Sequence, residues 1–224
     1  MMEFIKRIPP RAEFCFVLLV GFGDFLLANA HAVLRPSVAQ STYTNAGILG
    51  LVQYELLVAC ILAPLLYLRG WRLSQIAAPF TRSDIVATIG LIVAIYAADL
   101  LILQVAEGID PTMRAETERS FVLGNLLPGS AVMASVVNPF FEEMLLCGYI
   151  VTALKERRGL WFAVNASVAL RLAIHLYQGT MGVLIVPFGL LLTYWYARTN
   201  RLWPVIVAHA VFDLVALWPY VGNG

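Results

Sequence analysis

The sequence predicts an all-α polytopic membrane protein, a bundle of about seven transmembrane helices with a cytoplasmic N-terminus. Of its 224 residues, 60% are hydrophobic and only 13% are charged, whereas a soluble domain is roughly 45–50% apolar. Several apolar stretches reach the ~20 residues that a helix needs to cross a bilayer. Their apolar residues do not alternate with a period of two, as the strands of a membrane barrel would, so helices remain.

Seven apolar stretches are interpreted as spans. They lie near residues 14–34, 47–68, 84–105, 127–153, 160–177, 181–198 and 203–219. The mixed basic and apolar segment 71–82 is expected along the membrane interface, and the polar segment 106–120 is expected to form an outside loop. We divide the chain into an N-terminal three-helix membrane segment, 1–126, and a C-terminal four-helix core, 127–220.

The basic residues give the orientation. Eleven of the 15 Lys and Arg residues flank alternate ends of the spans, on one side of the membrane. They are Lys6, Arg7, Arg11, Arg69, Arg72, Arg82, Lys155, Arg157, Arg158, Arg198 and Arg201, against Arg35, Arg114 and Arg119 on the other side. Because cytoplasmic loops are enriched in Lys and Arg, the N-terminus is predicted to be cytoplasmic and the C-terminus outside.

Composition also limits the partners. The net charge is +1 and no basic stripe stands out, so no nucleic-acid partner is expected and the lipid bilayer is the main one. The three cysteines, Cys15, Cys60 and Cys147, lie within apolar runs without CxxC spacing and are interpreted as small hydrophobic residues. The first span resembles a secretory signal that ends at residues 28–30, but Asp24 interrupts its apolar run. It is expected to remain as an uncleaved anchor.

Ionisable groups at membrane depth are costly and need a partner or a function. In the N-terminal half such groups are scattered, and we interpret them as structural, either forming interhelical hydrogen bonds or being neutral protonated acids near a span end; they are Asp24, His31, Glu55 and Asp99. In the C-terminal half they form three pairs on three spans: Glu142 with Glu143, Arg171 with His175, and His209 with Asp213. The last two pairs are four residues apart, so each shares a helix face.

Packing these three faces together would create one pocket with a carboxylate, two imidazoles, a guanidinium and a second acid. Glutamate with histidine is a set that activates water, and a second histidine can stabilise the oxyanion of an attacked amide. No GxSxG turn supports a nucleophilic serine. Two alternatives remain open from these residues: an ion pathway, and a zinc site, although the HExxH signature is absent.

The three stretches NPFFEEMLLCGYI, RLAIHLYQGTMG and LWPVIVAHAVFDL resemble the three motifs of the CPBP (CAAX protease and bacteriocin-processing, or Abi) intramembrane endopeptidases. In that family the motifs read EExxxR, FxxxH and HxxxN or HxxxD, each on its own transmembrane helix. The resemblance covers about residues 130–220. It implies that the four-helix core is catalytic and hydrolyses a peptide bond of a membrane-associated, lipidated or secreted peptide or of a membrane protein.

The resemblance also implies roles for individual residues. Glu142 would activate the attacking water together with His175, while His209 and Asp213 would stabilise the oxyanion. These roles need no metal, so no cofactor is expected, with zinc as the alternative. Many members are bacterial, which implies an integral protein of a bacterial cytoplasmic membrane.

Two positions depart from the family pattern. Cys147 stands where the first motif has arginine, and Arg171 stands where the second motif has phenylalanine. We interpret this as a charge moved between helices, with Arg171 reaching Glu143 from the fifth span. Glu142 is assigned to chemistry and Glu143 to structural pairing.

Other functions remain open beside the protease. The missing arginine at position 147 favours a non-catalytic immunity or scaffold protein of the same fold, and the acids of the first three spans would suit a proton-coupled transporter. The motifs also lie at unequal depths along straight helices, so their convergence requires tilted helices or a later start of the fifth span.

Overall fold

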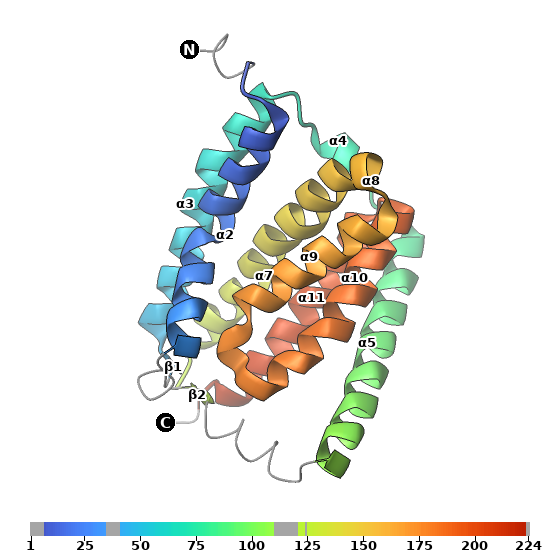
Figure 1. The fold of residues 1–224 in the computed structure, drawn as a ribbon. Helices are drawn as coiled ribbons and strands as arrows, with labels where there is room; N and C mark the ends of the chain where they lie inside the picture. Colours follow the sequence, from blue (N-terminus) through green and yellow to red (C-terminus); the bar gives the residue numbers. More distant parts are fainter. Residues whose placement is uncertain (1–6, 35–40, 110–120, 124, 223–224) are drawn as a thin grey trace.

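The computed structural model describes residues 7–34, 41–109, 121–123 and 125–222, and it confirms an all-α bundle (Figure 1). The α-helices are α2 (Pro10–Leu34), α3 (Asn45–Leu68), α4 (Leu73–Ile76), α5 (Arg82–Ile109), α7 (Pro128–Glu143), α8 (Thr152–Arg158), α9 (Leu160–Ile174), α10 (Ile185–Thr199) and α11 (Leu202–Leu217). A π-helix, η1 (Met144–Val151), joins α7 to α8, and η2 (Leu176–Leu184) and η3 (Trp218–Tyr220) are 3-10 helices. Two three-residue strands, β1 (Ser41–Tyr43) and β2 (Phe121–Leu123), pair in parallel.

The helices follow the predicted spans closely. Within the described residues, five helical segments are long and apolar enough to cross a membrane, namely α2, α3, α5, the continuous α7–η1–α8 segment and the α11–η3 segment. The fifth expected span is the shorter apolar helix α9, and the sixth is the 15-residue helix α10. Of the predicted outside loop, residues 110–120 lie outside the described part of the chain.

The helix ends that carry the basic residues gather at one end of the bundle, and the assignment of this end to the cytoplasm stays a prediction. The starts of α2, α5, α9 and α11 and the ends of α3, α8 and α10 lie at one end of the bundle, together with the N-terminus, and the C-terminus lies at the other end (Figure 1). These helix ends carry the described members of the basic set. Lys6, Arg35, Arg114 and Arg119 fall outside the described residues. The short helix α4 crosses the same end, where the interface segment 71–82 was expected.

Local sequence explains the helix boundaries. Thr44 caps α3 by accepting a hydrogen bond from the backbone N–H of Gly47 at 3.1 Å. Pro128 begins α7, where its missing N–H costs nothing. Gly159 separates α8 from α9 with φ of +90°, and Asn200 ends α10 in the left-handed region, conformations that favour glycine and asparagine.

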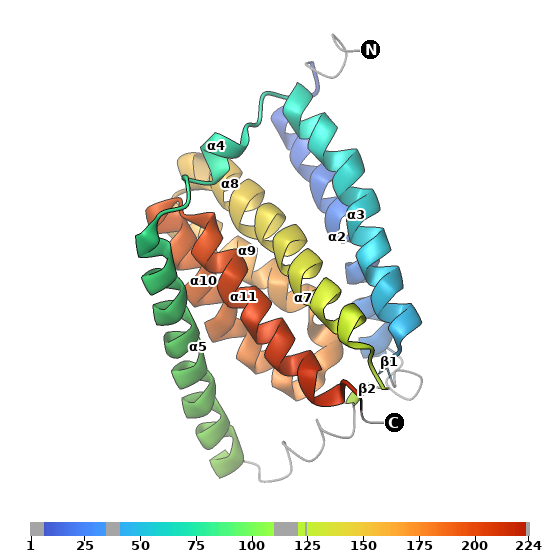
Figure 2. The same cartoon turned by 180° about the vertical axis from the view of Figure 1, so that it is seen from behind.

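The α7–η1 segment is central to the packing. Seen from behind, α7 and α11 lie between α5 on one side and the α2–α3 pair on the other (Figure 2). One apolar core joins η1 to α5, α9, α10 and α11, and a second joins α7 and η1 to α2 and α3. The helices α2, α3 and α5 pack directly on the last four helices. This packing shows no boundary near residue 126, so the division of the chain there stays a prediction.

Asn29 ties α2 to the end of α9. Its side-chain amide donates to the carbonyl oxygens of Phe25 and Ile174, both at 2.8 Å, and its Oδ1 accepts from the N–H of Tyr177 at 2.7 Å. The side chain is buried, so these bonds are not readily replaced by water.

We expect Asn29→Ala to lower stability by about 2 kcal/mol, because buried backbone groups lose their partners. Thermal unfolding in detergent measures the effect. Leu27→Ala, a change on the exposed face of α2, is the control and should shift the midpoint little. An equal shift in both variants would contradict a structural role for Asn29.

Candidate active site

Three helices bring polar residues of the C-terminal half into one buried cluster. Glu142 and Glu143 end α7, Arg171 lies in the last turn of α9, and His209 lies in α11. Glu143 and Arg171 are 0% exposed, and Glu142 and His209 are 4% and 3% exposed. The expected convergence of the fourth, fifth and seventh spans is therefore present at these four residues.

The carboxylate of Glu143 is fully engaged. Arg171 Nη2 lies 2.7 Å from Oε1 and 2.8 Å from Oε2, which confirms the predicted pairing between the fourth and fifth spans. His209 Nδ1 lies 2.6 Å from Oε1, and Cys147 Sγ donates to Oε2 at 3.1 Å. A buried carboxylate held by this many donors is stabilised as a structural anion.

Glu142 is much less engaged. Arg171 Nη1 lies 3.3 Å from Glu142 Oε2. Within the described residues, this is the one hydrogen bond that the Glu142 carboxylate makes. Adjacent helical residues point about 100° apart, so the two acids face different surroundings although they are neighbours in sequence. Glu142 thus keeps lone pairs that can bind a water molecule, and Glu143 does not.

The helix changes its winding directly after the two acids. The eight residues of η1 form a π-helix, a form that is rare and often found at functional sites. Its fourth residue, Cys147, is fully buried and points at Glu143. The position that holds arginine in the family pattern is thus still next to Glu143, but the positive charge comes from α9.

The chain provides space for Arg171. Its guanidinium lies 5.4 Å from the ring centroid of Phe188 in α10, a cation–π arrangement. A Cβ added at Gly189 would lie only 3.2 Å from Arg171 Cδ. Gly189 therefore leaves the room that this large buried side chain needs.

We expect Gly189→Ala to destabilise the protein by about 1–3 kcal/mol, because the added methyl group crowds a packed core. The matched control is Gly90→Ala in α5, where an added Cβ meets nothing within 4 Å; it should be neutral or slightly stabilising. Thermal unfolding of both variants in detergent measures the difference. Equal midpoints would show that Arg171 has more room than its contacts indicate.

His209 is held between two acids. Its Nδ1 bonds Glu143, and its Nε2 lies 3.4 Å from Asp213 Oδ1, one turn further along α11. Asp213 Oδ2 accepts from the side-chain amide of Asn138 at 3.1 Å. The ring is thus fixed through Nδ1, while the looser contact leaves Nε2 able to bind another acceptor.

Asn138 is a residue that the sequence interpretation missed. It lies four residues before Glu142, so the two side chains share one face of α7, and this spacing was the available signal. In the HxxxN form of the third motif, the asparagine places an amide donor on the last helix. Asn138 places an amide donor on α7 instead.

His175 is placed differently from the expectation of two imidazoles in contact with the acids. It follows the last residue of α9, and its Nδ1 lies 2.8 Å from the carbonyl oxygen of Arg171. None of its hydrogen bonds or ring contacts among the described residues reaches Glu142, Glu143 or His209. The physical reason is depth: α9 begins at Leu160 as expected, so Arg171 meets the acids and His175 lies one turn beyond.

Glu55 of α3 is a further acid beside the cluster. It is 0% exposed, and neither carboxyl oxygen has a hydrogen-bond partner among the described residues. It lies close enough to interact electrostatically with Glu142, Asp213 and His209. Of the two structural roles expected for it, an interhelical hydrogen bond is not formed among the described residues, and a neutral protonated acid stays a prediction. Asp24 is exposed and Asp99 is half-buried.

Glu55 also lines an apolar cavity of about 330 Å³ between α3, the α4 segment and α7–η1. Apart from Glu55 and Arg72, its walls are apolar or aromatic side chains, among them Leu62, Phe141 and Met144. The cavity thus joins the interface segment to the neighbourhood of the buried acids.

The residues that could hold a metal ion are Glu142, Glu143 and His209, whose ligand atoms lie within 4.8 Å of one another. Arg171 occupies this space with a guanidinium 2.7 Å from one carboxylate and 3.3 Å from the other. A divalent cation there would be repelled at short range by a positive charge that is already paired with its ligands. The donor set therefore suits an arginine better than zinc.

The fold and the cluster define a class, an integral membrane protein with a polar centre of glutamates, arginine and histidine buried among its helices. The comparison with protein families agrees. The family model described as "Type II CAAX prenyl endopeptidase Rce1-like" matches residues 124–215. The three motifs lie within this segment, so the match confirms the resemblance of residues 124–215 to the CPBP intramembrane endopeptidases. No curated protein and no solved structure matches the chain.

Proposed function

We propose that the protein hydrolyses a peptide bond of a lipidated peptide, using a water molecule activated by Glu142. One observation carries this proposal: the two adjacent acids are unequal, since among the described residues Glu143 is saturated by donors and Glu142 has a single long hydrogen bond. A general base must be able to accept a proton from water, and only the less engaged carboxylate has free lone pairs for it.

The chemistry follows from the neighbours of Glu142. The carboxylate removes a proton from water, and the resulting hydroxide attacks the carbonyl carbon of the peptide bond. The oxyanion that forms is stabilised by His209 Nε2–H, with the Asn138 amide as a second donor. Glu142 then returns the proton to the leaving amine, and the C–N bond breaks.

Asp213 and His175 have supporting roles in this scheme. Asp213 lies between Asn138 and His209 and orients both donors. His175 is assigned to the water with Glu142, as the family resemblance implies. If its Nδ1–H donates to the Arg171 carbonyl, its Nε2 remains an acceptor that can bind this water.

The apolar cavity supports a lipidated substrate. The matched family is named for CAAX prenyl endopeptidases. The apolar cavity is lined by Phe141 and Met144, the sequence neighbours of the two acids, and would hold a prenyl chain while the peptide bond lies at the acids. The family's bacterial members suggest a bacterial cytoplasmic membrane as the location.

The alternatives are less well supported. An inactive immunity or scaffold protein was favoured by Cys147, but Arg171 supplies the missing charge to Glu143. A proton-coupled transporter would need several acids along one path, and of the N-terminal acids only Glu55 interacts with the cluster among the described residues.

The proposal is tested with purified protein in detergent and a farnesylated CAAX peptide, followed by mass spectrometry of the products. We expect cleavage between the prenylated cysteine and the C-terminal tripeptide, with the same peptide lacking the farnesyl group cleaved far more slowly. Chelators should leave the rate unchanged. Chelator inhibition reversed by zinc would favour the metal alternative, and equal rates for both peptides would contradict the role of the cavity.

A further inference from the structure

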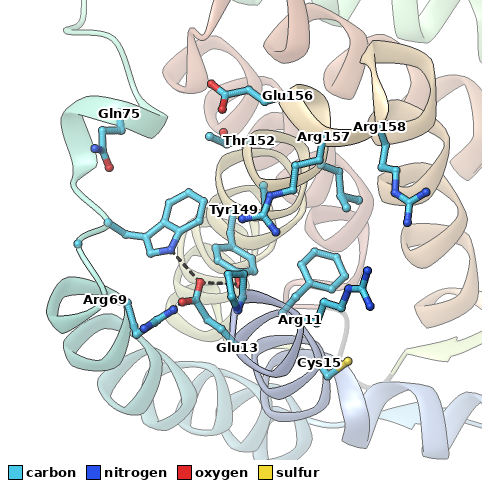
Figure 3. A pocket seen from close by; sticks show the side chains of 16 residues that line it. Arg11, Glu13, Cys15, Arg69, Gln75, Tyr149, Thr152, Glu156, Arg157 and Arg158 are labelled. Carbon is cyan, nitrogen blue, oxygen red and sulfur yellow. Dashed lines mark hydrogen bonds and ion pairs between the residues drawn. The ribbon is translucent and has the colours of Figure 1, made fainter. Parts of the chain in front are cut away.

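A second, charged cavity opens at the predicted cytoplasmic end of the bundle. It has a volume of about 860 Å³ and lies between the start of α2, the connection from α3 to α4, and the end of η1 with α8. Figure 3 shows the side chains that line it. It is distinct from the cluster around Glu142, none of whose residues lines it.

The floor of this cavity is a satisfied polar and aromatic layer. Glu13 is buried and accepts hydrogen bonds from Trp71 Nε1 at 2.9 Å and from the Tyr149 hydroxyl at 3.0 Å, and it pairs with Arg69 Nε at 2.5 Å. The rings of Trp71 and Phe14 pack on the ring of Tyr149. The charge of Glu13 is therefore balanced within the floor.

The mouth of the cavity carries uncompensated positive charge. Arg11 of α2 and Arg157 and Arg158 of α8 lie around the opening (Figure 3). All three are exposed, and none forms an ion pair with a carboxylate among the described residues. Glu156 is the remaining acid in the lining, so the mouth keeps a net positive charge.

The position of the cavity indicates the source of the anion. Helix ends rich in Arg lie at the cytoplasmic headgroup level, where each basic residue contributes about 1 kcal/mol to the attraction of anionic lipid. Guanidinium groups bind phosphate oxygens through paired hydrogen bonds. Trp71 and Tyr149 also line the apolar cavity beside α3, so polar and apolar space adjoin here, as a lipid with a charged headgroup and apolar chains requires.

We propose that this cavity binds the phosphate headgroup of an anionic phospholipid of the cytoplasmic leaflet, through Arg11, Arg157 and Arg158. The floor formed by Glu13, Trp71 and Tyr149 limits how deeply the headgroup enters. The site does not depend on peptidase activity, so it can be tested whether or not the protein cleaves a peptide.

The test uses phosphatidylglycerol titrated into the purified protein in a neutral detergent, with bound lipid counted by native mass spectrometry. We expect Arg11→Gln with Arg157→Gln to weaken binding about tenfold or more, from the loss of two charge-assisted contacts. The matched control is Arg82→Gln with Arg198→Gln, which removes two exposed arginines that are outside the cavity at the same end. The control should retain the wild-type affinity.

Two further arms separate the possible anions. Phosphatidylcholine, with the same chains but no net charge, should bind more weakly than phosphatidylglycerol, and an excess of inorganic phosphate should not displace the bound lipid. Equal losses in the two double variants, or equal binding of the two lipids, would overturn the proposal. Displacement by inorganic phosphate would overturn the lipid as the occupant and assign the cavity to a soluble phosphate.

Discussion

Replacing Arg171 with leucine is expected to destabilise the protein by about 3–5 kcal/mol, because it leaves Glu143 buried without its counter-charge. Arg171 and Glu143 are both 0% exposed and form an ion pair at 2.7 Å. Thermal unfolding in detergent measures the loss. The control is Arg201→Leu, which breaks an ion pair with Asp84 in which the arginine is one-third exposed. Its loss should be smaller, because the Asp84 carboxylate keeps the backbone N–H and the hydroxyl of Thr81 as donors.

A charge swap tests the same interaction more sharply. Arg171→Phe with Cys147→Arg restores the arrangement of the family motifs, with the cation one helical turn after Glu143. Since Cys147 Sγ and Arg171 both contact the Glu143 carboxylate, the double variant should be more stable than Arg171→Phe alone. A double variant no more stable than that single one would contradict the idea that the charge moved between helices.

Glu142→Gln is expected to reduce the rate of peptide hydrolysis by about 100-fold or more, because the amide cannot accept the proton of water. Its effect on stability should be small, since Glu142 makes one hydrogen bond, at 3.3 Å, within the described part of the chain. Steady-state kinetics on a cleaved peptide, together with thermal unfolding, separates the two effects.

Glu143→Gln is the matched control, with the same chemical change one residue further along the chain. It should lower the unfolding temperature, because the amide is a weaker partner for Arg171 and His209 than the carboxylate. If Glu142→Gln kept the activity while Glu143→Gln lost it without loss of stability, the roles of the two acids would be reversed.

The sequence predicted the helices well, because length and hydropathy decide which segments can cross a bilayer. It also predicted the meeting of Glu142, Arg171 and His209, since residues four apart share a helix face and each motif occupies its own span. The pairing of Arg171 with Glu143 followed from one missing and one extra charge.

Other features of the site depend on tertiary packing, which spacing does not encode. The depth of His175 is set by where α9 begins and how it is tilted, and the position of Glu55 by the packing of α3 on α7. The room at Gly189 follows from the approach of α10 to Arg171.

Asn138, in contrast, could have been predicted from the sequence, because its spacing of four residues places it on the same helix face as Glu142.

The most direct test of the central claim compares the peptides of cells that express the wild-type protein, the Glu142→Gln variant or the Arg201→Leu variant. Mass spectrometry of the membrane and secreted fractions identifies new C-termini. We predict a set of cleavage products that is present with the wild type and with Arg201→Leu and absent with Glu142→Gln. Identical products with the wild type and Glu142→Gln, at equal protein levels, would contradict a glutamate-activated intramembrane hydrolysis.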